Sequence, residues 1–374
     1  MEFRDLKRQY QLHKEEIDGA VQEVIDSAHF ISGPQVTRLE RELAEYVGVG
    51  HCIACANGTD ALQLALMAWE TGVGDAVFVP DFTFFSSGEV VPLVGAVPVF
   101  VDIDRDTFNI SADSLRDAVE YVLHHTDLNP KAVVAVDLFG QPADYEAVRR
   151  VADTYGLLVL EDAAQSFGGM TGEQKACSFG DISTTSFFPA KPLGCYGDGG
   201  AVFTDNEEWA QRIRSLHVHG KGSDKYDNVR IGLNSRLDTV QAAVLLQKMR
   251  FFEEEVAACG RVAAKYDERL RDVVKTPVIL NGNRSGWAQY TICLKDAAER
   301  DKVMAQMKAD GIPSAVYYRK PMHRQEAFAG MLCGAERCEN TEDICERCLS
   351  LPMHPYLEDA EIEAVCESVK SAVG

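Results

Sequence analysis

The chain has 374 residues, of which 46% are hydrophobic and 25% charged, a composition typical of a folded globular protein. Its formal net charge of -21 at pH 7 disfavours nucleic-acid and membrane-surface functions, because phosphate groups would repel it. The first residues are charged and no stretch reaches the roughly 20 apolar residues that span a bilayer, so we expect a cytoplasmic protein without a membrane segment.

Short apolar runs alternate with helical patterns, such as 60–70 and 145–155, from residue 51 to about 205. The runs are continuously apolar, which is typical of parallel strands covered on both faces. We therefore predict an α/β fold with a mostly parallel seven-stranded sheet flanked by helices. The predicted strands are 52–56, 76–80, 96–102, 132–137, 157–162, 183–188 and 201–204.

The C-terminal part predicts a smaller α+β domain, since the chain exceeds the length at which one core keeps growing. A polar loop, KGSDKYDNVRIGLNS, precedes a long helical pattern from Leu237 to Ala258. We place the boundary near 245–255, which gives a large domain of 1–250 with N-terminal helices and a small domain of 251–374. The small domain is predicted to hold helices at 260–272, 297–310 and 358–372 and strands at 287–294 and 312–318.

The eleven cysteines predict free thiols, since an odd number in a cytosolic chain does not suit a disulfide framework. Cys52 and Cys55 are three apart on a predicted strand, so their side chains should face opposite sides of the sheet. The four C-terminal cysteines lack the tight, turn-borne pairs of structural zinc sites, because two of them fall in a helical-looking stretch. We therefore predict no metal site at Cys333, Cys338, Cys345 and Cys348.

Lys191 lies in SFFPAKPLGCYGDGG, between an apolar strand and a turn with four glycines. Glycine lets the backbone approach a ligand closely, and a lysine in a partly desolvated pocket can form a Schiff base. A surface lysine on a flexible loop is the alternative interpretation.

Two polar residues follow the strand LLVLED. Asp162 closes that strand, where open α/β sheets bind ligands, and a carboxylate there could hold a pyridinium nitrogen protonated. Gln165 could donate a hydrogen bond to a phenolic oxygen on the ring that carries this pyridinium nitrogen. A helix N-cap is the alternative role for Asp162.

Two further strand ends could contact such a ligand. Gly58 and Thr59 stand where a strand turns into a helix, and the helix N-terminus is an anion site. Phe84, in PDFTFF, could offer an aromatic face to a flat cofactor, whereas core packing is the alternative for these phenylalanines.

Taken together and in this order, these motifs resemble the DegT/DnrJ/StrS family of sugar aminotransferases, within fold type I of the pyridoxal-phosphate enzymes. The resemblance runs from end to end of the chain. It is carried by MEFRDLKRQY, FISGPQVTRLE, CANGTDAL, PDFTFFSSGE, VDIDRDTFNI, EDAAQSFGG, SFFPAKPLGCYGDGGAVFT, GLNSRLDTVQAAVLL, PMHRQEAF and LSLPMHPYL.

The resemblance implies a role for each matching position. Lys191 would bind pyridoxal 5'-phosphate as a Schiff base and Asp162 would pair with its ring nitrogen. The other implied cofactor contacts are Gln165 at the ring hydroxyl, Phe84 stacked on the ring, and Gly58, Thr59 and Ser186 at the phosphate. Family members are homodimers, so either Asn234 or Arg236 of a partner subunit would complete the phosphate site.

The implied reaction is transfer of an amino group from L-glutamate to a nucleotide-linked keto-sugar. The stretches RIGLNSRLDTVQAAVLL and PMHRQEAF resemble members that aminate C3 of UDP-linked 3-oxo sugars, including 2-acetamido uronates. TDP-linked 3-keto or 4-keto hexoses stay open as substrates, as does a regulatory or scaffold protein that kept the fold. The expected sugar contacts are Tyr317, Tyr318, Arg319 and His323.

Overall fold

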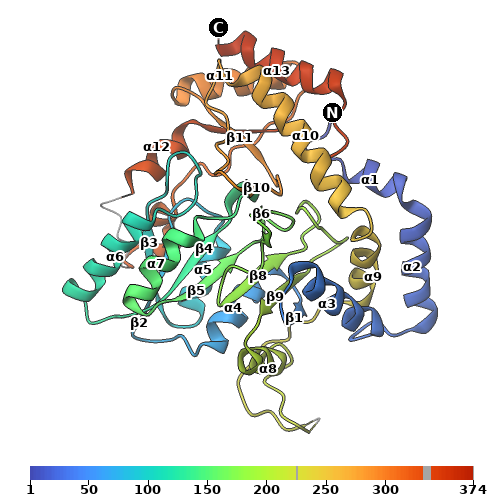
Figure 1. Cartoon of the computed structure of the whole chain (residues 1–374), viewed down its shortest axis with the longest axis vertical. Helices are drawn as coiled ribbons and strands as arrows, with labels where there is room; N and C mark the ends of the chain where they lie inside the picture. Colours follow the sequence, from blue (N-terminus) through green and yellow to red (C-terminus); the bar gives the residue numbers. More distant parts are fainter. Residues whose placement is uncertain (225, 332–337, 374) are drawn as a thin grey trace.

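The computed structural model describes residues 1–224, 226–331 and 338–373 (Figure 1). Its central sheet has seven strands, and neighbouring strands are parallel except that β9 runs antiparallel to both of its neighbours. All seven coincide with predicted strands, and the α/β fold class is confirmed. In sheet order the strands are β1 (His51–Cys55), β9 (Gly200–Thr204), β8 (Ile182–Ser186), β5 (Leu158–Asp162), β4 (Asn129–Val136), β2 (Asp75–Pro80) and β3 (Val97–Val101).

Helices cover both faces of this sheet because successive strand residues point to opposite sides. One face packs against α4 (Gly58–Ala68), α5 (Ser86–Leu93) and α8 (Glu207–Leu216). The other face packs against α6 (Ala112–His125), α7 (Tyr145–Tyr155), α3 (Pro34–Val47) and α9 (Thr239–Lys248). Cys55 belongs to the first core and Cys52 to the second, as the strand period predicted.

The C-terminal region has a core of its own, formed by residues between Cys259 and Ala372. Figure 1 shows α10, α11 and α13 gathered with β11 at one end of the molecule. The elements of this region are α10 (Phe252–Leu270), β11 (Tyr290–Cys293), α11 (Ala297–Ala309), α12 (Glu339–Arg347), β12 (Cys348–Leu351) and α13 (Asp359–Val373). A division between large and small domains at residue 250 stays a prediction.

The remaining elements are short or N-terminal. The helices α1 (Leu6–Leu12) and α2 (Lys14–Ser27) lie along one side of the molecule, where α2 packs on α9 (Figure 1). A small sheet joins β10 (Asn283–Arg284), β6 (Met170–Thr171) and β7 (Gln174–Lys175), and single 3-10 turns are η1 (Leu138–Gly140), η2 (Met322–Arg324) and η3 (Glu326–Phe328). No helix in the described part of the chain is both long and apolar enough to span a bilayer.

Two predictions from the sequence were wrong, one for residues 237–258 and one for residues 312–318. The helical pattern of 237–258 is two helices, because the chain leaves helical geometry at Phe251 (φ -120°, ψ 6°) before a new first turn that contains three glutamates. Acidic groups favour a helix N-terminus, whereas apolar periodicity alone runs across the break.

The second error concerns the pairing partner of β11. The predicted strand at 312–318 forms only one isolated bridge, between Ala315 and Ser350, and β11 pairs with β12 instead. All four residues of β12 are buried, whereas the sequence alone predicts a helical stretch through Cys345 and Cys348. Short apolar runs are ambiguous between helix and strand by periodicity alone.

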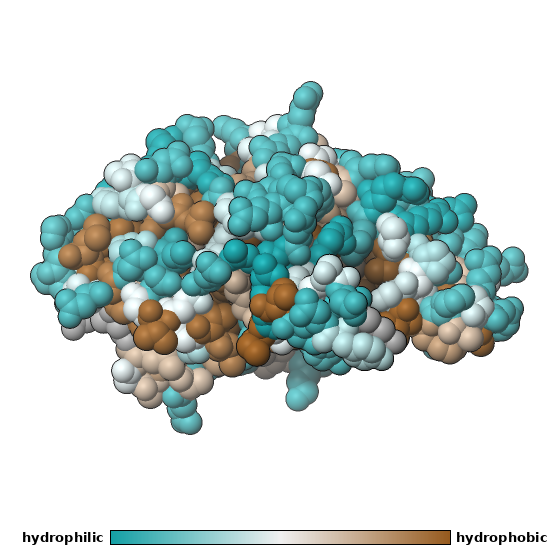
Figure 2. Space-filling model, turned by 90° about the horizontal axis from the view of Figure 1, so that it is seen from below, coloured by the Kyte–Doolittle hydropathy of each residue, from teal (hydrophilic) through white to brown (hydrophobic). Residues whose placement is uncertain are grey.

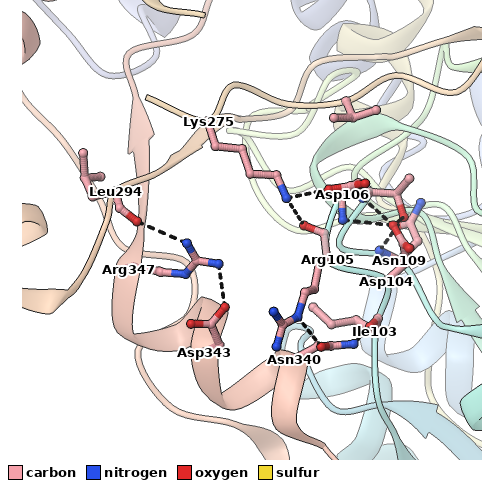
Figure 3. A network of polar contacts seen from close by, with 12 residues as sticks. Ile103, Asp104, Arg105, Asp106, Asn109, Lys275, Leu294, Asn340, Asp343 and Arg347 are labelled. Atoms are coloured by element: carbon pink, nitrogen blue, oxygen red, sulfur yellow. Dashed lines mark hydrogen bonds and ion pairs between the residues drawn. The ribbon is translucent and has the colours of Figure 1, made fainter. Parts of the chain in front are cut away.

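The helix α12 lies against the loop that follows β3 (Figure 3). Asn340 Nδ2 donates to the carbonyl oxygen of Ile103 at 2.8 Å, and Asn340 also bonds to Arg105. Asp106, on the same loop, pairs with Lys275 of the C-terminal region, whose Nζ lies 2.6 Å from Asp106 Oδ1. Polar contacts therefore join the C-terminal region to the carboxyl edge of the sheet.

Candidate active site

Lys191 lies in the turn that follows β8, and its side chain is half-buried. Within the described residues its amine makes no hydrogen bond or ion pair. Burial lowers the pKa of Lys191, nearby Asp162 opposes this shift, and the Arg4 guanidinium adds to it. Arg4 Nη2 also donates to the Lys191 carbonyl oxygen at 3.1 Å, which helps to fix the backbone of the turn. The amine is therefore free to react and easier to deprotonate than an ordinary lysine.

Asp162 is the last residue of β5, the strand beside β8, and only 5% of its surface is exposed. Ser87 Oγ donates to its Oδ2 at 2.8 Å and the Ala164 N–H donates to its Oδ1 at 3.2 Å. Burial raises the pKa of Asp162, while these two hydrogen bonds and Lys191 oppose the rise. Residues 164–168 form a turn and not a helix, so Asp162 is not a helix cap.

Gln165 and Phe84 meet at the ring of Tyr318. Gln165 Oε1 accepts the Phe139 N–H at 2.7 Å, and its Nε2 donates to the Tyr318 hydroxyl at 3.2 Å. The Phe84 ring is 53% exposed, with its centroid 6.4 Å from that of Tyr318. Phe84 is therefore not a core residue, and one aromatic face is open.

The N-terminus of α4 faces the end of β8. A side chain at Gly58 would bring its Cβ within 2.7 Å of Ser186 Cβ, so only glycine allows this approach. Thr59 Oγ1 lies 2.8 Å from Ser86 Oγ. The first N–H groups of a helix have no intrahelical acceptor, so Gly58, Thr59 and Ser186 form a compact set of donors for an anion.

The loop that follows α8 extends from the body of the molecule in Figure 1, and Asn234 and Arg236 lie where this chain segment returns to the body, on either side of the fully buried Ser235. The Arg236 guanidinium bonds to the Asn234 side-chain oxygen, and Asn234 is exposed. Among the described residues, neither side chain forms a hydrogen bond or ion pair with Lys191, Asp162 or Thr59. Ser235, which lies between them, accepts the Ala56 N–H on its Oγ at 3.1 Å, so the backbone of this segment lies beside the turn that precedes Gly58.

The four expected sugar contacts have different surroundings. The Tyr317 ring packs 6.3 Å from the Phe3 ring, and Tyr318 lies between Gln165 and Phe84. The exposed Arg319 contacts Met304 Sδ on α11 at 3.7 Å. His323 points both ring nitrogens at carboxylates, Asp81 at 2.7 Å and Glu342 at 3.0 Å. Only Tyr317 and Tyr318 are thus grouped with the other candidate residues.

Several residues beside the site were not found from the sequence. Ser87 holds Asp162, and nothing in the SS pair of PDFTFFSSGE distinguishes it from Ser86. Lys248 is buried and donates to the Gly194 carbonyl oxygen at 2.6 Å, with its amine 4.5 Å from the centre of the Tyr196 ring. Burial lowers the pKa of Lys248 to about 8. A lysine at the end of the amphipathic helix α9 looks like a surface residue, so no sequence signal marked it.

The described cysteines are all free, buried thiols. Cys345 lies on α12 and Cys348 on β12, whereas Cys333 lies outside the described residues. A different group, formed by Asp81, His323 and Cys338, brings three potential ligand atoms within 4.8 Å of one another.

Comparison with known proteins identifies one family over nearly the whole chain. The model of the DegT/DnrJ/EryC1/StrS aminotransferase family matches residues 11–370. UDP-2-acetamido-2-deoxy-3-oxo-D-glucuronate aminotransferase of Pseudomonas aeruginosa is 44% identical over 370 residues, which cover 99% of each chain.

Two solved structures share this fold. The crystal structure of a DegT DnrJ EryC1 StrS aminotransferase from Brucella abortus is 48% identical, covers 100% of both chains and gives a TM-score of 0.98. NtdA from Bacillus subtilis, solved with bound cofactor PMP, is 29% identical with a TM-score of 0.87, covering 96% of this chain and 82% of its own. The chain therefore belongs to the DegT/DnrJ/EryC1/StrS aminotransferase family.

Proposed function

We propose that this chain transfers an amino group from L-glutamate to C3 of a UDP-linked 3-oxo sugar, with pyridoxal 5'-phosphate as cofactor. The substrate class includes the 2-acetamido-3-oxo uronates. One observation carries the proposal: the free, half-buried amine of Lys191 lies beside the buried carboxylate of Asp162, at the ends of two neighbouring strands.

The residues present fit this cofactor. A flat ring with a basic nitrogen and a phosphate needs an amine to bind it, a carboxylate for the nitrogen, an apolar face and anion donors. Lys191, Asp162 and the exposed face of Phe84 supply the first three. The clash that any side chain at Gly58 would make with Ser186 shows that the backbone at the N-terminus of α4 is packed as closely as an anion cradle requires.

Each residue then has a defined task. The bound cofactor supplies an electron sink for the carbanion at the substrate's Cα. Asp162 keeps a proton on the ring nitrogen, and Gln165 donates to the ring oxygen. With the cofactor bound, the Lys191 amine would move a proton to and from the amino acid's Cα. Its lowered pKa suits it to accept this proton near neutral pH.

The proposed sugar follows the relative from Pseudomonas aeruginosa, whose name specifies a UDP-linked 3-oxo glucuronate. Tyr317 and Tyr318 stand beside Phe84 and Gln165, so we assign the sugar to this side of the site. The position of Arg319 over α11 gives no support for a sugar contact by this residue.

We also propose a homodimer in which Asn234 and Arg236 of each subunit complete the partner's phosphate site. The NGT turn and Ser186 offer mainly neutral donors, and a phosphate dianion calls for a cation or amide as well. The same segment exposes 91% of Ile231 and 54% of Val229, which is unusual for apolar residues and favours burial by another subunit. Figure 2 shows apolar groups among the mainly hydrophilic surface seen from below.

The test is a panel of nucleotide-linked keto-sugars incubated with the enzyme and isotopically labelled L-glutamate. The panel pairs UDP-linked with TDP-linked 3-keto and 4-keto sugars, each with and without a carboxylate at C6. We expect labelled product, identified by mass spectrometry, mainly from the UDP-linked 3-oxo uronate. Preference for a TDP-linked or 4-keto sugar would contradict the substrate assignment, and no amino transfer to any sugar would contradict the proposed function.

A further inference from the structure

Asp81 follows directly after β2, and its side chain is fully buried. The His323 N–H donates to its Oδ1 at 2.8 Å, and His323 Nδ1 lies 2.7 Å from its Oδ2. The Asp81 carbonyl oxygen also accepts the Met322 N–H at 3.0 Å. Three hydrogen bonds thus join the end of β2 to the turn η2 of the C-terminal region.

The His323 ring stands between two carboxylates. Its Nε2 lies 3.0 Å from Glu342 Oε1 on α12, and Arg324 Nη2 lies 2.7 Å from the same oxygen. Among the described residues, the Cys338 thiol at the start of α12 also faces this bridge, and the Cys345 thiol on the same helix lies near Asp81 and Glu342. The hydrogen bond to Asp81 raises the pKa of His323, and burial partly opposes the rise. Two carboxylates on one ring fit an imidazolium ion that donates from both nitrogens.

The helix that carries Glu342 is itself fixed to the sheet. Asp102, directly after β3, accepts the N–H groups of Asn340 and Thr341 at 2.9 Å each. Asn340 in turn bonds to the loop after β3, as Figure 3 shows. Glu342 is therefore a fixed support for the His323 ring and not a mobile surface carboxylate.

Both chain segments joined by the bridge continue to one aromatic wall of the candidate site. From Asp81 the chain reaches Phe82 and Phe84, whose ring centroids lie 5.9 and 6.4 Å from that of Tyr318. From His323 the chain leads back to Tyr318, whose hydroxyl accepts from Gln165. The two chain segments therefore meet at both of their ends: at the bond between Asp81 and His323, and at the contact between the rings.

A metal ion is the competing interpretation of this cluster, because Asp81, His323 and Cys338 offer oxygen, nitrogen and sulfur ligands. Two ligands on a tetrahedral zinc ion lie roughly 3.3 Å apart, from metal–ligand distances of about 2 Å. The observed 2.7 Å between His323 Nδ1 and Asp81 Oδ2 is a hydrogen-bond distance instead. The geometry thus favours the protonated bridge.

We infer that His323 is a positioning residue, and not a sugar contact, whose bridge between Asp81 and Glu342 holds Phe84 and Tyr318 in place for the cofactor. The inference rests on the proposed function, because Phe84 is the proposed cofactor contact and Tyr318, on the sugar side, packs against it. Without the bridge a smaller fraction of the molecules holds the aromatic wall in the binding geometry. The apparent affinity for the cofactor falls in proportion to that fraction.

The experiment measures binding of pyridoxamine phosphate to cofactor-free full-length protein by calorimetry. This probe cannot form a Schiff base with Lys191, so it reports the non-covalent cradle alone. We expect His323→Asn and Asp81→Asn each to raise its Kd about tenfold, for a binding-competent fraction reduced to about one tenth. The double variant should bind no more weakly than the weaker single one, because both changes break one bridge.

Two further variants serve as a control and as a milder disruption of the bridge. His124 on α6 pairs with Glu120 at the surface, so His124→Asn removes a histidine–carboxylate pair far from this wall and should leave the Kd unchanged. Glu342→Gln removes only the outer carboxylate, whose side chain is 32% exposed, and should fold even where the Asp81 variant does not. It should weaken binding less than His323→Asn does.

The pH dependence supplies an independent measurement. Because the pKa of His323 in the folded chain is raised above its ordinary value, its bridging contribution is complete at low pH and is lost as pH rises through the raised folded-state pKa. The ratio of the Kd of His323→Asn to the Kd of wild type should therefore fall with increasing pH. Because both proteins bind the same probe, the titration of the probe itself cancels in this ratio.

The outcomes separate the two proposals. If wild type binds neither pyridoxamine phosphate nor pyridoxal phosphate, the proposed function is wrong. If wild type binds and the folded Asp81, His323 and Glu342 variants bind equally well, the positioning role alone is overturned. One zinc ion per chain in the purified protein, lost in His323→Asn and Cys338→Ser, would also overturn the protonated bridge in favour of a metal site.

Discussion

Ser87 Oγ, at the start of α5, donates a 2.8 Å hydrogen bond to Asp162 Oδ2 at the end of β5. It is one of two hydrogen bonds that hold the pKa of Asp162 down against burial. A serine from another element thus favours the ionised form of the carboxylate and orients it, which suits pairing with a protonated ring nitrogen.

Ser87→Ala should move the acid limb of the activity profile to higher pH. Removing the donor raises the pKa of Asp162 further, so the carboxylate form is lost at a higher pH as the solution is acidified. The turnover at neutral pH should fall by roughly 10- to 150-fold, since a hydrogen bond to a charged group contributes about 1.5–3 kcal/mol and about 1.36 kcal/mol is a factor of ten. The measurement is the pH dependence of kcat and kcat/KM with L-glutamate.

Asp162→Asn shows the activity that remains when the carboxylate is absent, and it gives the lower limit for the Ser87→Ala measurements. The amide should still allow cofactor binding but lose most of the activity at every pH, because it cannot keep the ring nitrogen protonated. Thr154→Ala, which removes an exposed hydroxyl on α7, is the matched control. A Ser87 variant with an unchanged acid limb would show that Ser87 does not tune Asp162.

Lys191→Ala should abolish transamination and the visible absorption of lysine-bound pyridoxal phosphate, while circular dichroism shows an intact fold. The amine has no hydrogen bond or ion pair among the described residues, so its removal breaks no polar contact. Borohydride reduction followed by peptide mass spectrometry should find the label on Lys191 in wild type. A label on Lys248, the other buried lysine beside this turn, would make the assignment wrong.

Lys248→Met tests the buried cation under the glycine turn. Burial lowers the pKa of Lys248 to about 8 in the folded chain, from an ordinary lysine value of 10.5. The unfolded chain therefore binds the proton more tightly, and the stability of wild type relative to the variant rises with pH between about 8 and 10.5. At 1.36 kcal/mol per pKa unit the full gain is about 3 kcal/mol.

Urea unfolding of both proteins at pH 7.5 and pH 10 gives this difference, and titrations common to both cancel. A wild-type advantage that stays constant or shrinks with pH would show that the Lys248 pKa is not lowered. In either case the loss of the bond to the Gly194 carbonyl should weaken cofactor binding, because that turn follows Lys191.

Mixed dimers test the shared site. Inactive Lys191→Ala subunits mixed with inactive subunits carrying Asn234→Ala and Arg236→Glu should recover activity, because hybrid dimers contain one site built from two intact halves. The statistical limit is a quarter of the wild-type activity, since half of the dimers are hybrid and each has one complete site. A monomer in sedimentation, or inactive mixtures despite proven subunit exchange, would contradict the proposal.

The sequence by itself determined the strands of the sheet, because most of them are continuous apolar runs bounded by turns or helical patterns, whereas β8 (Ile182–Ser186) is mainly polar. It also marked Lys191, Asp162 and Gly58, because chemistry at a strand end depends on residue type and on local order along the chain. Cys52 and Cys55 fell on opposite faces for the same reason, namely the two-residue period of a strand.

Only the tertiary structure decided the contacts between distant segments. Asp81 and His323 are 242 positions apart, and neither position shows in isolation that their side chains meet. The same holds for Ser87 with Asp162 and for Lys248 with Gly194. The partner of β11 was also a question of packing, because a short apolar run is compatible with helix or strand until the neighbouring strand selects one.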